Sequence, residues 1–311
     1  MAPINLKELT KKEIKFTSGQ RMCTGCGPAI IGKWTLLAAA DYNVAMTEAT
    51  CCMEISTVVY PYTSWKVSWY HNAFENAAAV AGGIEATYKA LKRKGKLDKG
   101  FKFIAMGGDG GTYDIGFQAL SGMAERGHNV LYIVYDNNAY MNTGIQRSGA
   151  TPKYAWTTTS YVGDAYQGKQ QRRKDLVSIM AAHDIPYVAQ ASLGYWRDYM
   201  TKVQKGLEAD GPAFISVYAP CWRGWRTETH DTVELGRLAV QTRYWPLFEV
   251  VNGKWAMTYV PRETKPLTDW LKPQGRFSHL FKPEYAHLLE DFQKEVDYKW
   301  DQLQRRVAAS S

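Results

Sequence analysis

Apolar runs alternate with amphipathic segments along most of the chain. The run Phe101–Met106 predicts a buried strand, Asp114–Arg126 a helix, and Asn129–Tyr135 a second strand. A helix between two buried strands is typical of parallel strands joined by a crossover connection. This part of the sequence therefore predicts a βαβ unit.

The same alternation continues toward the C-terminus. Helices are predicted at Arg173–His183 and Tyr195–Glu208, and strands at Tyr187–Gln190 and Ala213–Tyr218. No internal repeat or low-complexity stretch interrupts the pattern. We therefore expect an α/β fold, with a mainly parallel sheet and helices on both faces.

Two further segments predict helices that contact other parts of the assembly. Glu75–Lys94 is expected to form a long helix, and its small residues imply close packing on the sheet or on a partner subunit. Beyond Tyr259, prolines stand at positions 261, 266, 273 and 283, and a charged helix is expected near Tyr285–Arg306. We therefore divide the chain into a domain of residues 1–260 and an extended C-terminal arm of residues 261–311 that contacts partner subunits.

The composition is that of a globular protein. The chain has 311 residues, 45% of them hydrophobic, which allows one elaborate domain or two small ones. No apolar run approaches the roughly 20 residues that span a bilayer. The N-terminal residues also lack the apolar core of a secretory signal. We expect no membrane span and a cytoplasmic location.

The net charge of +8 is spread over the chain rather than gathered in one arm. The short basic runs Lys92–Lys96 and Arg172–Lys174 are typical of solvated helix faces, which disfavours nucleic acid as a partner. A basic surface would also attract an acidic electron carrier. In that case turnover with the carrier should fall steeply as salt rises.

Glycines and polar residues follow the two strands of the βαβ unit. Gly107–Gly111 (GGDGG) follows the first strand, and Asp136–Asn138 (DNN) follows the second. Parallel strands bring these ends to one edge of the sheet, where α/β folds bind ligands. Glycine amides there can face a phosphate, and Asp109 and Asn137 can supply oxygen ligands to Mg²⁺.

The glycine-rich segment alone is equally compatible with a structural turn. Two observations favour a thiamine-diphosphate site over a structural turn or a dinucleotide site. Asn137 follows Asp109 by 28 residues at the end of the next strand, which resembles the thiamine-diphosphate motif. No G-x-G-x-x-G follows a strand, which disfavours a dinucleotide.

Five cysteines in a reducing compartment argue for metal or cofactor ligation rather than disulfides, although any one of them could be a free buried thiol. Cys23 and Cys26 form a C-x-x-C pair, Cys51 and Cys52 follow, and Cys221 comes after a predicted strand. Four thiolates from these positions are compatible with a 4Fe–4S cluster or with structural Zn²⁺. A thiamine cofactor nearby would favour the cluster, because its oxidation requires an acceptor of single electrons.

These motifs together resemble the β subunit of pyruvate:ferredoxin oxidoreductase and its close 2-oxoacid relatives, over roughly residues 15–280. The segments that carry the resemblance are CTGCG, EATCCMEISTVVYPYTSWKVSW, HNAFENAAAVAGGIEA, GGDGGTYDIGFQALSGMAERGHNVLYIVYDNNAYMNTGIQRSGATP and PAFISVYAPC. The resemblance implies a thiamine-diphosphate-binding fold and the oxidative decarboxylation of a 2-oxoacid. Pyruvate is the default substrate, with phenylglyoxylate and oxalate as alternatives, and coenzyme A accepts the acyl group in most relatives.

The resemblance also implies which residues bind the cofactors. The cluster ligands of the family correspond to Cys23, Cys26, Cys52 and Cys221. Cys51 stands where the family usually has glycine, so it is the alternative third ligand. The Mg²⁺ ligands correspond to Asp109, Asn137 and the carbonyl of Ala139. The expected cofactor-binding set is Gly108, Asp109, Gly110, Gly111, Asn137, Ala139, Tyr140 and Thr143.

Two residues are candidates for catalysis. Asn142 lies in the loop that resembles the family's active-site loop and could hydrogen-bond the substrate, or it could be a turn residue that satisfies local backbone. His71 could orient the substrate carboxylate or carry a proton, with a capping or packing role as the alternative. Glu54 could hydrogen-bond backbone N–H groups near the cluster, and the segment CWRGWR at 221–226 could shield it or stack on the surface.

One required group is missing from the sequence. Thiamine enzymes need a glutamate facing N1′ of the aminopyrimidine, and in the resembling family another subunit or domain supplies it. We therefore expect an active site at a subunit interface, an inactive isolated chain, and a ferredoxin-like iron–sulfur subunit or other acceptor. Two alternatives of other classes are a non-oxidative thiamine-dependent decarboxylase or carboligase without iron, and a zinc-stapled structural subunit without thiamine.

Overall fold

An eight-stranded sheet forms the centre of the protein in the computed structural model, which describes residues 4–310. The strand order is β2-β1-β3-β4-β6-β5-β7-β8. The strands are β1 Val44–Ala49, β2 Ser68–Asn72, β3 Lys102–Gly108, β4 Leu131–Asp136, β5 Tyr187–Ser192, β6 Ala213–Tyr218, β7 Leu247–Val251 and β8 Lys254–Tyr259. Strands β1 to β6 pair in parallel, whereas β7 and β8 pair antiparallel at one edge. The predicted mainly parallel sheet is confirmed.

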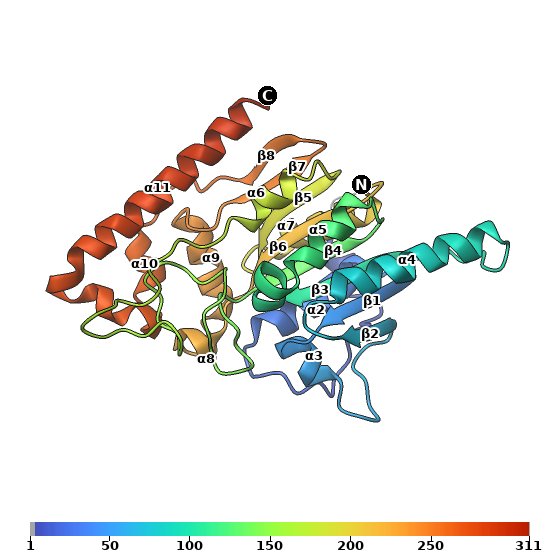
Figure 1. Cartoon of the computed structure of the whole chain (residues 1–311), viewed down its shortest axis with the longest axis horizontal. Helices are drawn as coiled ribbons and strands as arrows, with labels where there is room; N and C mark the ends of the chain where they lie inside the picture. Colours follow the sequence, from blue (N-terminus) through green and yellow to red (C-terminus); the bar gives the residue numbers. More distant parts are fainter. Residues whose placement is uncertain (1–3, 311) are drawn as a thin grey trace.

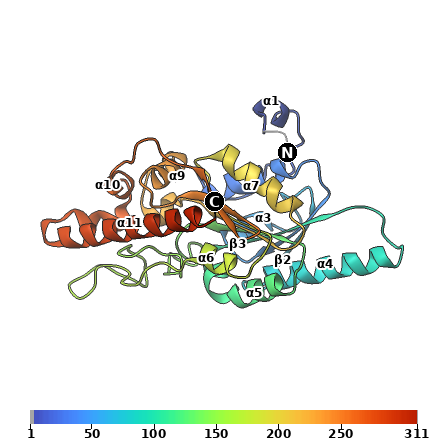
Figure 2. The ribbon, with the colours of Figure 1, turned by 90° about the horizontal axis from the view of Figure 1, so that it is seen from above.

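Helices cover both faces of the sheet. They are α1 Leu6–Leu9, α2 Gly27–Ala38, α3 Cys52–Thr57, α4 Ala77–Arg93, η1 Gly110–Ile115, α5 Phe117–Glu125, α6 Leu176–Ala181, α7 Trp196–Glu208, α8 Trp222–Trp225, α9 Thr232–Gln241, α10 Leu267–Leu271, η2 Gly275–Phe281, η3 Pro283–Tyr285 and α11 Ala286–Ala308. Figures 1 and 2 show α4, α5 and α6 on one face and α7 on the other. The predicted fold class is confirmed. No helix in residues 4–310 is both long and apolar enough to cross a membrane.

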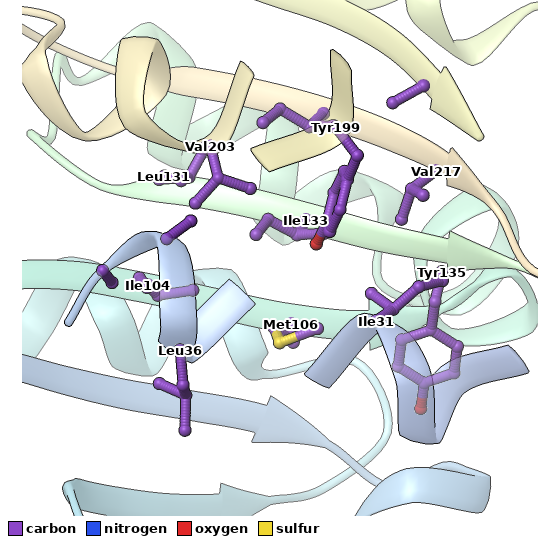
Figure 3. Close-up of a cluster of buried hydrophobic side chains, with 14 of the residues drawn as sticks. Ile31, Leu36, Ile104, Met106, Leu131, Ile133, Tyr135, Tyr199, Val203 and Val217 are labelled. Carbon is purple, nitrogen blue, oxygen red and sulfur yellow. The ribbon is translucent and has the colours of Figure 1, made fainter. Parts of the chain in front are cut away.

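The alternation of side chains along each strand explains why the strands read as continuous apolar runs. Ile104 and Met106 of β3 pack toward α2 and α7, together with Ile133 of β4 (Figure 3). Phe103 and Ala105 of the same strand pack toward α4 and α5 on the opposite face. Because both faces are buried, polar residues are excluded until the strand ends.

The strand and helix boundaries differ from the predicted ones where the site begins. Strand β3 continues through Gly107 and Gly108, which still pair with β4. The following helix starts at Gly110 with a π-helical turn rather than at Asp114. Strands β1 and β2, which complete the sheet beside β3, were not anticipated, because their short segments carry mixed polar and apolar residues.

The segment after Tyr259 packs on the sheet domain through its first half and ends in the long helix α11 (Figure 1). Leu267, Trp270 and Phe277 share one hydrophobic cluster with Trp225 and Trp245 from the preceding part of the chain. This cluster crosses the proposed division at residue 260, and the division itself stays a prediction. The segment therefore contributes to the core behind the sheet edge.

Candidate functional site

A cavity lies at the carboxyl edge of the sheet, where the ends of β1, β3 and β4 meet. We call it the strand-end cavity. The predicted cofactor-binding residues that line it are Gly108, Asp109, Gly110, Asn137, Ala139, Tyr140 and Thr143, and Asn142 lines it as well. Gly111, the next residue in the chain, lines neither this cavity nor the second cavity described below. The parallel topology thus brings together residues that are far apart in the sequence.

Three oxygen-bearing groups converge in this cavity. The side-chain amide of Asn137 lies 2.7 Å from Asp109 Oδ1 and 2.9 Å from the carbonyl oxygen of Ala139. Turned with its nitrogen toward them, the amide donates to both; turned with its oxygen, three acceptors meet without a donor. Neighbouring ligands in a Mg²⁺ octahedron lie about 2.9 Å apart. The residues therefore fit a magnesium ion held by these three oxygens.

Asp109 is held in place from several sides. It is the first residue after β3, and Ser148 Oγ donates to its Oδ2 at 2.5 Å. Burial, and secondarily the negative charge of Asp136, raises the pKa of Asp109 well above its usual range. A bound divalent cation would reverse this effect by stabilising the carboxylate.

The turn that carries Asn137 is braced by buried groups beneath it. Asn138 adopts a left-handed conformation with φ of 70°, which asparagine tolerates better than most residues. Its side-chain nitrogen donates to Asp136 Oδ1 at 2.6 Å, and its Oδ1 accepts from Arg276 Nη2 at 3.0 Å. Trp225 Nε1 donates to the carbonyl of Asn137 at 2.8 Å. Through Arg276, the C-terminal segment thereby supports the turn that carries Asn137.

Glycine is required where the cavity walls approach the backbone. A Cβ atom on Gly110 would lie 2.5 Å from the ring of Tyr140, and one on Gly108 would lie 2.7 Å from Cys51 Sγ. Both distances are shorter than any ordinary carbon contact. Glycine at these positions therefore lets Tyr140 and Cys51 pack directly against the backbone at the strand ends.

A second cavity, the thiol cavity, adjoins the first. Its lining includes four of the five cysteines, which come from three separate parts of the chain: Cys23, Cys26, Cys52 and Cys221. Cys51 does not line this cavity; it faces the strand-end cavity, where its Sγ accepts from the N–H of Gly108 at 3.3 Å. The predicted four-cysteine set is thus brought to one place, and the adjacent thiol is separated from it.

Burial keeps the thiols of this cavity in their neutral form. Burial raises the pKa of Cys26 to about 12 and also raises the pKa of Cys52 and Cys221. Such thiols stay protonated unless a metal displaces the proton. Within residues 4–310, no three His, Cys, Asp or Glu side chains converge tightly enough to hold one metal ion.

The two cavities share a wall. Cys52, Asn137 and Asn142 line both of them. A ligand at the strand ends and a group held by the thiols would therefore be neighbours, separated by one layer of side chains.

His71, the other predicted catalytic residue, lies outside both cavities. It lies in β2, one residue before the end of the strand, and its side chain is 55% exposed. The distance from its Nδ1 to Glu54 Oε1 is 2.8 Å. Glu54 is buried in α3, and its second oxygen has no partner among the described residues. A role for His71 stays a prediction.

The aromatic and basic residues after Cys221 divide between two environments. Trp222 and Arg223 line the thiol cavity, whereas Trp225 is fully buried and Arg226 stacks on Trp156 at 3.6 Å from the ring centre. Sequence reasoning missed Ser148 and the buried Arg276, because neither belongs to a motif whose spacing points to the strand ends.

Comparisons with known proteins agree with this geometry. Residues 49–217 match the family model "Thiamine pyrophosphate enzyme, C-terminal TPP binding domain". A 2-oxoglutarate:ferredoxin oxidoreductase from Magnetococcus marinus has the same fold, with a TM-score of 0.56 at 21% identity, covering 74% of this chain and 80% of that chain.

Curated relatives match over nearly their full length. The chain is 50% identical to pyruvate synthase subunit PorB of Thermotoga maritima, over 97% of this chain and 96% of the relative. It is 53% identical to PorB of Methanocaldococcus jannaschii, over 93% and 96%. It is 44% identical to ketoisovalerate oxidoreductase subunit VorB of Pyrococcus abyssi, over 94% and 93%. The chain therefore belongs to the thiamine pyrophosphate enzyme family and, within it, to the family of 2-oxoacid oxidoreductase subunits that includes PorB and VorB.

Proposed function

We propose that this chain is the cofactor-binding subunit of a 2-oxoacid:ferredoxin-type oxidoreductase and holds both thiamine diphosphate with Mg²⁺ and a 4Fe–4S cluster. The observation that carries this proposal is the shared wall of Cys52, Asn137 and Asn142 between the strand-end cavity and the thiol cavity. An acceptor of single electrons beside the thiamine site is what oxidative decarboxylation requires. The four cysteines that line one cavity also supply the number of thiolates that a 4Fe–4S cluster takes.

Each part of the site has a role in this reaction. Thiamine diphosphate, when bound, supplies the nucleophilic carbon and the electron sink for decarboxylation. Asp109, Asn137 and the Ala139 carbonyl would hold Mg²⁺ against the diphosphate. Asn142 would orient the substrate through its amide. The expected partner subunits supply the N1′ glutamate and the onward acceptor.

Pyruvate is the proposed substrate, with coenzyme A as the acyl acceptor. The identity to PorB relatives, 50% and 53%, exceeds the 44% identity to a VorB relative. Phenylglyoxylate and oxalate remain alternative substrates for the same chemistry. We further propose a cytoplasmic location, because all five cysteines are free and a thiol cavity requires a reducing compartment.

The test uses the chain co-purified anaerobically with its partner subunits. We expect iron and acid-labile sulfide on this chain, bound thiamine, and reduction of a viologen dye that depends on pyruvate and coenzyme A. Zinc without iron or thiamine would favour the structural alternative. Release of CO₂ from pyruvate without dye reduction, in a protein lacking iron, would favour the non-oxidative one. The isolated chain should bind the cluster yet reduce no dye.

A further inference from the structure

A buried lysine that belongs to no recognised motif holds a loop next to the proposed magnesium site. Lys169 is 2% exposed, and its Nζ donates to the carbonyl of Thr151 at 2.6 Å. The same Nζ donates to the carbonyls of Ser148 at 3.4 Å and Gly149 at 3.5 Å. Within residues 4–310, all of its side-chain hydrogen bonds go to these backbone carbonyls, and no carboxylate forms an ion pair with it. The ammonium group therefore grips residues 148–151, which we call the 148–151 loop.

This loop contacts both strand ends that carry the proposed magnesium ligands. Ser148 Oγ donates to Oδ2 of Asp109, the first residue after β3, at 2.5 Å. Thr151 Oγ1 donates to the carbonyl of Asn138, in the turn after β4, at 2.7 Å. The two contacts are linked, because the N–H of Ser148 donates to Thr151 Oγ1 at 2.9 Å. Displacement of the loop would therefore disturb both strand ends together.

The backbone that carries Lys169 is fixed as well. Its N–H donates to the carbonyl of Ala155 at 3.1 Å, and its carbonyl accepts from the N–H of Tyr154 at 2.7 Å. Gly168 allows this close pairing, since its φ is 73° and a Cβ atom there would lie 2.5 Å from the carbonyl oxygen of Tyr154. The ammonium group thus projects toward the loop from a rigid support.

Packing alone does not explain a lysine at this position. Burial of an ammonium group without a carboxylate partner is costly, and an apolar side chain would fill the same space without that cost. What the ammonium adds is three N–H donors, and three loop carbonyls accept from it. We propose that Lys169 is a positioning residue that, through the 148–151 loop, holds Asp109 and the turn after β4 in the geometry that binds Mg²⁺ and the diphosphate. This inference rests on the proposed function.

The charge of this ammonium group depends on pH near neutrality. Burial, with smaller contributions from the positive charges of Arg147 and Arg173, lowers the pKa of Lys169 to about 7. The charged groups near it on neighbouring segments are Asp114 of η1, Arg147, Arg172, Arg173, Lys174 and Glu295 of α11. Below this pKa the ammonium donates three hydrogen bonds, whereas the neutral amine above it donates two and turns a lone pair toward the carbonyls. The grip on the loop should therefore weaken as pH rises through the pKa.

The experiment measures thiamine diphosphate binding calorimetrically in the complete multi-subunit protein at a fixed Mg²⁺ concentration. Below neutral pH, K169M should weaken binding at least about tenfold, as expected when a group that orients a metal ligand is removed. K254M, which replaces an exposed lysine of β8, is the control and should bind like the wild type. Wild-type protein that binds no thiamine diphosphate would contradict the proposed function itself. Equal binding by the wild type and K169M would overturn only the role of Lys169.

Two further measurements distinguish positioning from packing. Because Lys169 acts through Ser148, the double variant K169M/S148A should weaken binding by far less than the roughly 100-fold product of two independent tenfold effects. The ratio of wild-type to K169M affinity should also fall several-fold between about pH 6 and about pH 8.5, on either side of the pKa of Lys169, since other groups titrate in both proteins. Multiplicative effects, or a ratio that does not change with pH, would overturn the proposal. K169Q replaces K169M in every measurement if the melting temperature shows that K169M is unfolded.

Discussion

Cys51 and Cys52 are neighbours in the chain and both line the strand-end cavity, but only Cys52 also lines the thiol cavity. Cys51 is in an extended conformation, and Cys52 begins α3, so the chain changes direction between them. Cys51 Sγ consequently accepts from Gly108 at the strand ends, while Cys52 joins the other three thiols. Under the proposed function, this geometry favours Cys52 over Cys51 as the third cluster ligand.

Substitution of each cysteine by serine tests this assignment. Under the proposed function, C52S should lose most of its iron and acid-labile sulfide, because one of four ligands is removed. C51S is the matched control and should keep the cluster. Iron, sulfide and electron paramagnetic resonance of the reduced protein measure the difference. The reverse pattern would identify Cys51 as the ligand.

Ser148 positions Asp109, one ligand of the proposed magnesium site. Its hydroxyl donates to Oδ2 of Asp109 and fixes the orientation of the carboxylate. Groups that orient a metal ligand commonly contribute 10- to 100-fold to metal affinity, so S148A should raise the Mg²⁺ concentration needed for half-saturation roughly tenfold. Cofactor binding followed by tryptophan fluorescence measures this. The control T87A removes an exposed hydroxyl on α4 that bonds only its own helix. An unchanged Mg²⁺ requirement in S148A would remove Ser148 from the site.

At the scale of elements, the site depends on a strand that ends in glycine and passes directly into a helix. Strand β3 delivers Gly108 and Asp109 to the edge, and η1 begins at the next residue. Parallel pairing with β4 sets Asp109 beside Asn137. The register of the two strands brings their ends together, and the residues that directly follow each strand supply the proposed magnesium ligands.

Two glycine-to-alanine substitutions distinguish the close packing at Gly110 from the general effect of replacing a helical glycine. G110A would place a Cβ against the ring of Tyr140, so it should lower the free energy of unfolding by about 1–3 kcal/mol and weaken thiamine diphosphate binding. G83A on exposed α4 meets no atom within 4 Å and should raise the free energy of unfolding by about 0.5–1 kcal/mol. Denaturant titrations measure both. Equal effects of the two substitutions would contradict the close approach at Gly110.

At the scale of the whole molecule, the C-terminal segment is connected to the site. Arg276 is 2% exposed, and its guanidinium lies 3.9 Å from the ring centre of Trp225 while bonding Asn138 and Gln274. Burial lowers the pKa of Arg276, because desolvation disfavours the charged guanidinium. The contacts with Trp225, Asn138 and Gln274 offset the free-energy cost of burying this charge. The path from the C-terminal segment to the magnesium ligands is thus a chain of direct contacts.

Removal of this guanidinium should affect both stability and cofactor binding. R276M removes the shorter of two hydrogen bonds to Asn138 Oδ1 and leaves only the Tyr218 hydroxyl at 3.4 Å, so we expect the free energy of unfolding to fall by about 2 kcal/mol. Loosening of the turn should also raise the half-saturating thiamine diphosphate concentration several-fold. The control R262Q alters an exposed arginine of the same segment and should change neither quantity. Loss of stability without a change in cofactor binding would restrict Arg276 to a role in packing.

The local pattern of apolar and polar residues predicted much of the observed fold. The βαβ unit, the parallel sheet and the position of Asp109 and Asn137 at its edge follow from apolar runs that end in glycine or asparagine. The first two strands were missed because their segments lack a clear period, and the packing of residues 267–281 was not anticipated because prolines conceal the apolar side chains between them. His71 illustrates the limit for sites, since the sequence did not indicate that its side chain would hydrogen-bond Glu54.

The amino-acid sequence by itself determined the chemistry available here: the hard oxygen ligands, the glycines beside them and the soft thiols, because residue identity sets what each group can bind. Only the tertiary structure decided which of these groups meet. The separation of Cys51 from Cys52, the shared wall of the two cavities and the brace from Arg276 arise from strand register and chain direction. Contacts between residues distant in the chain depend on how the whole sheet packs, and no short motif encodes that packing.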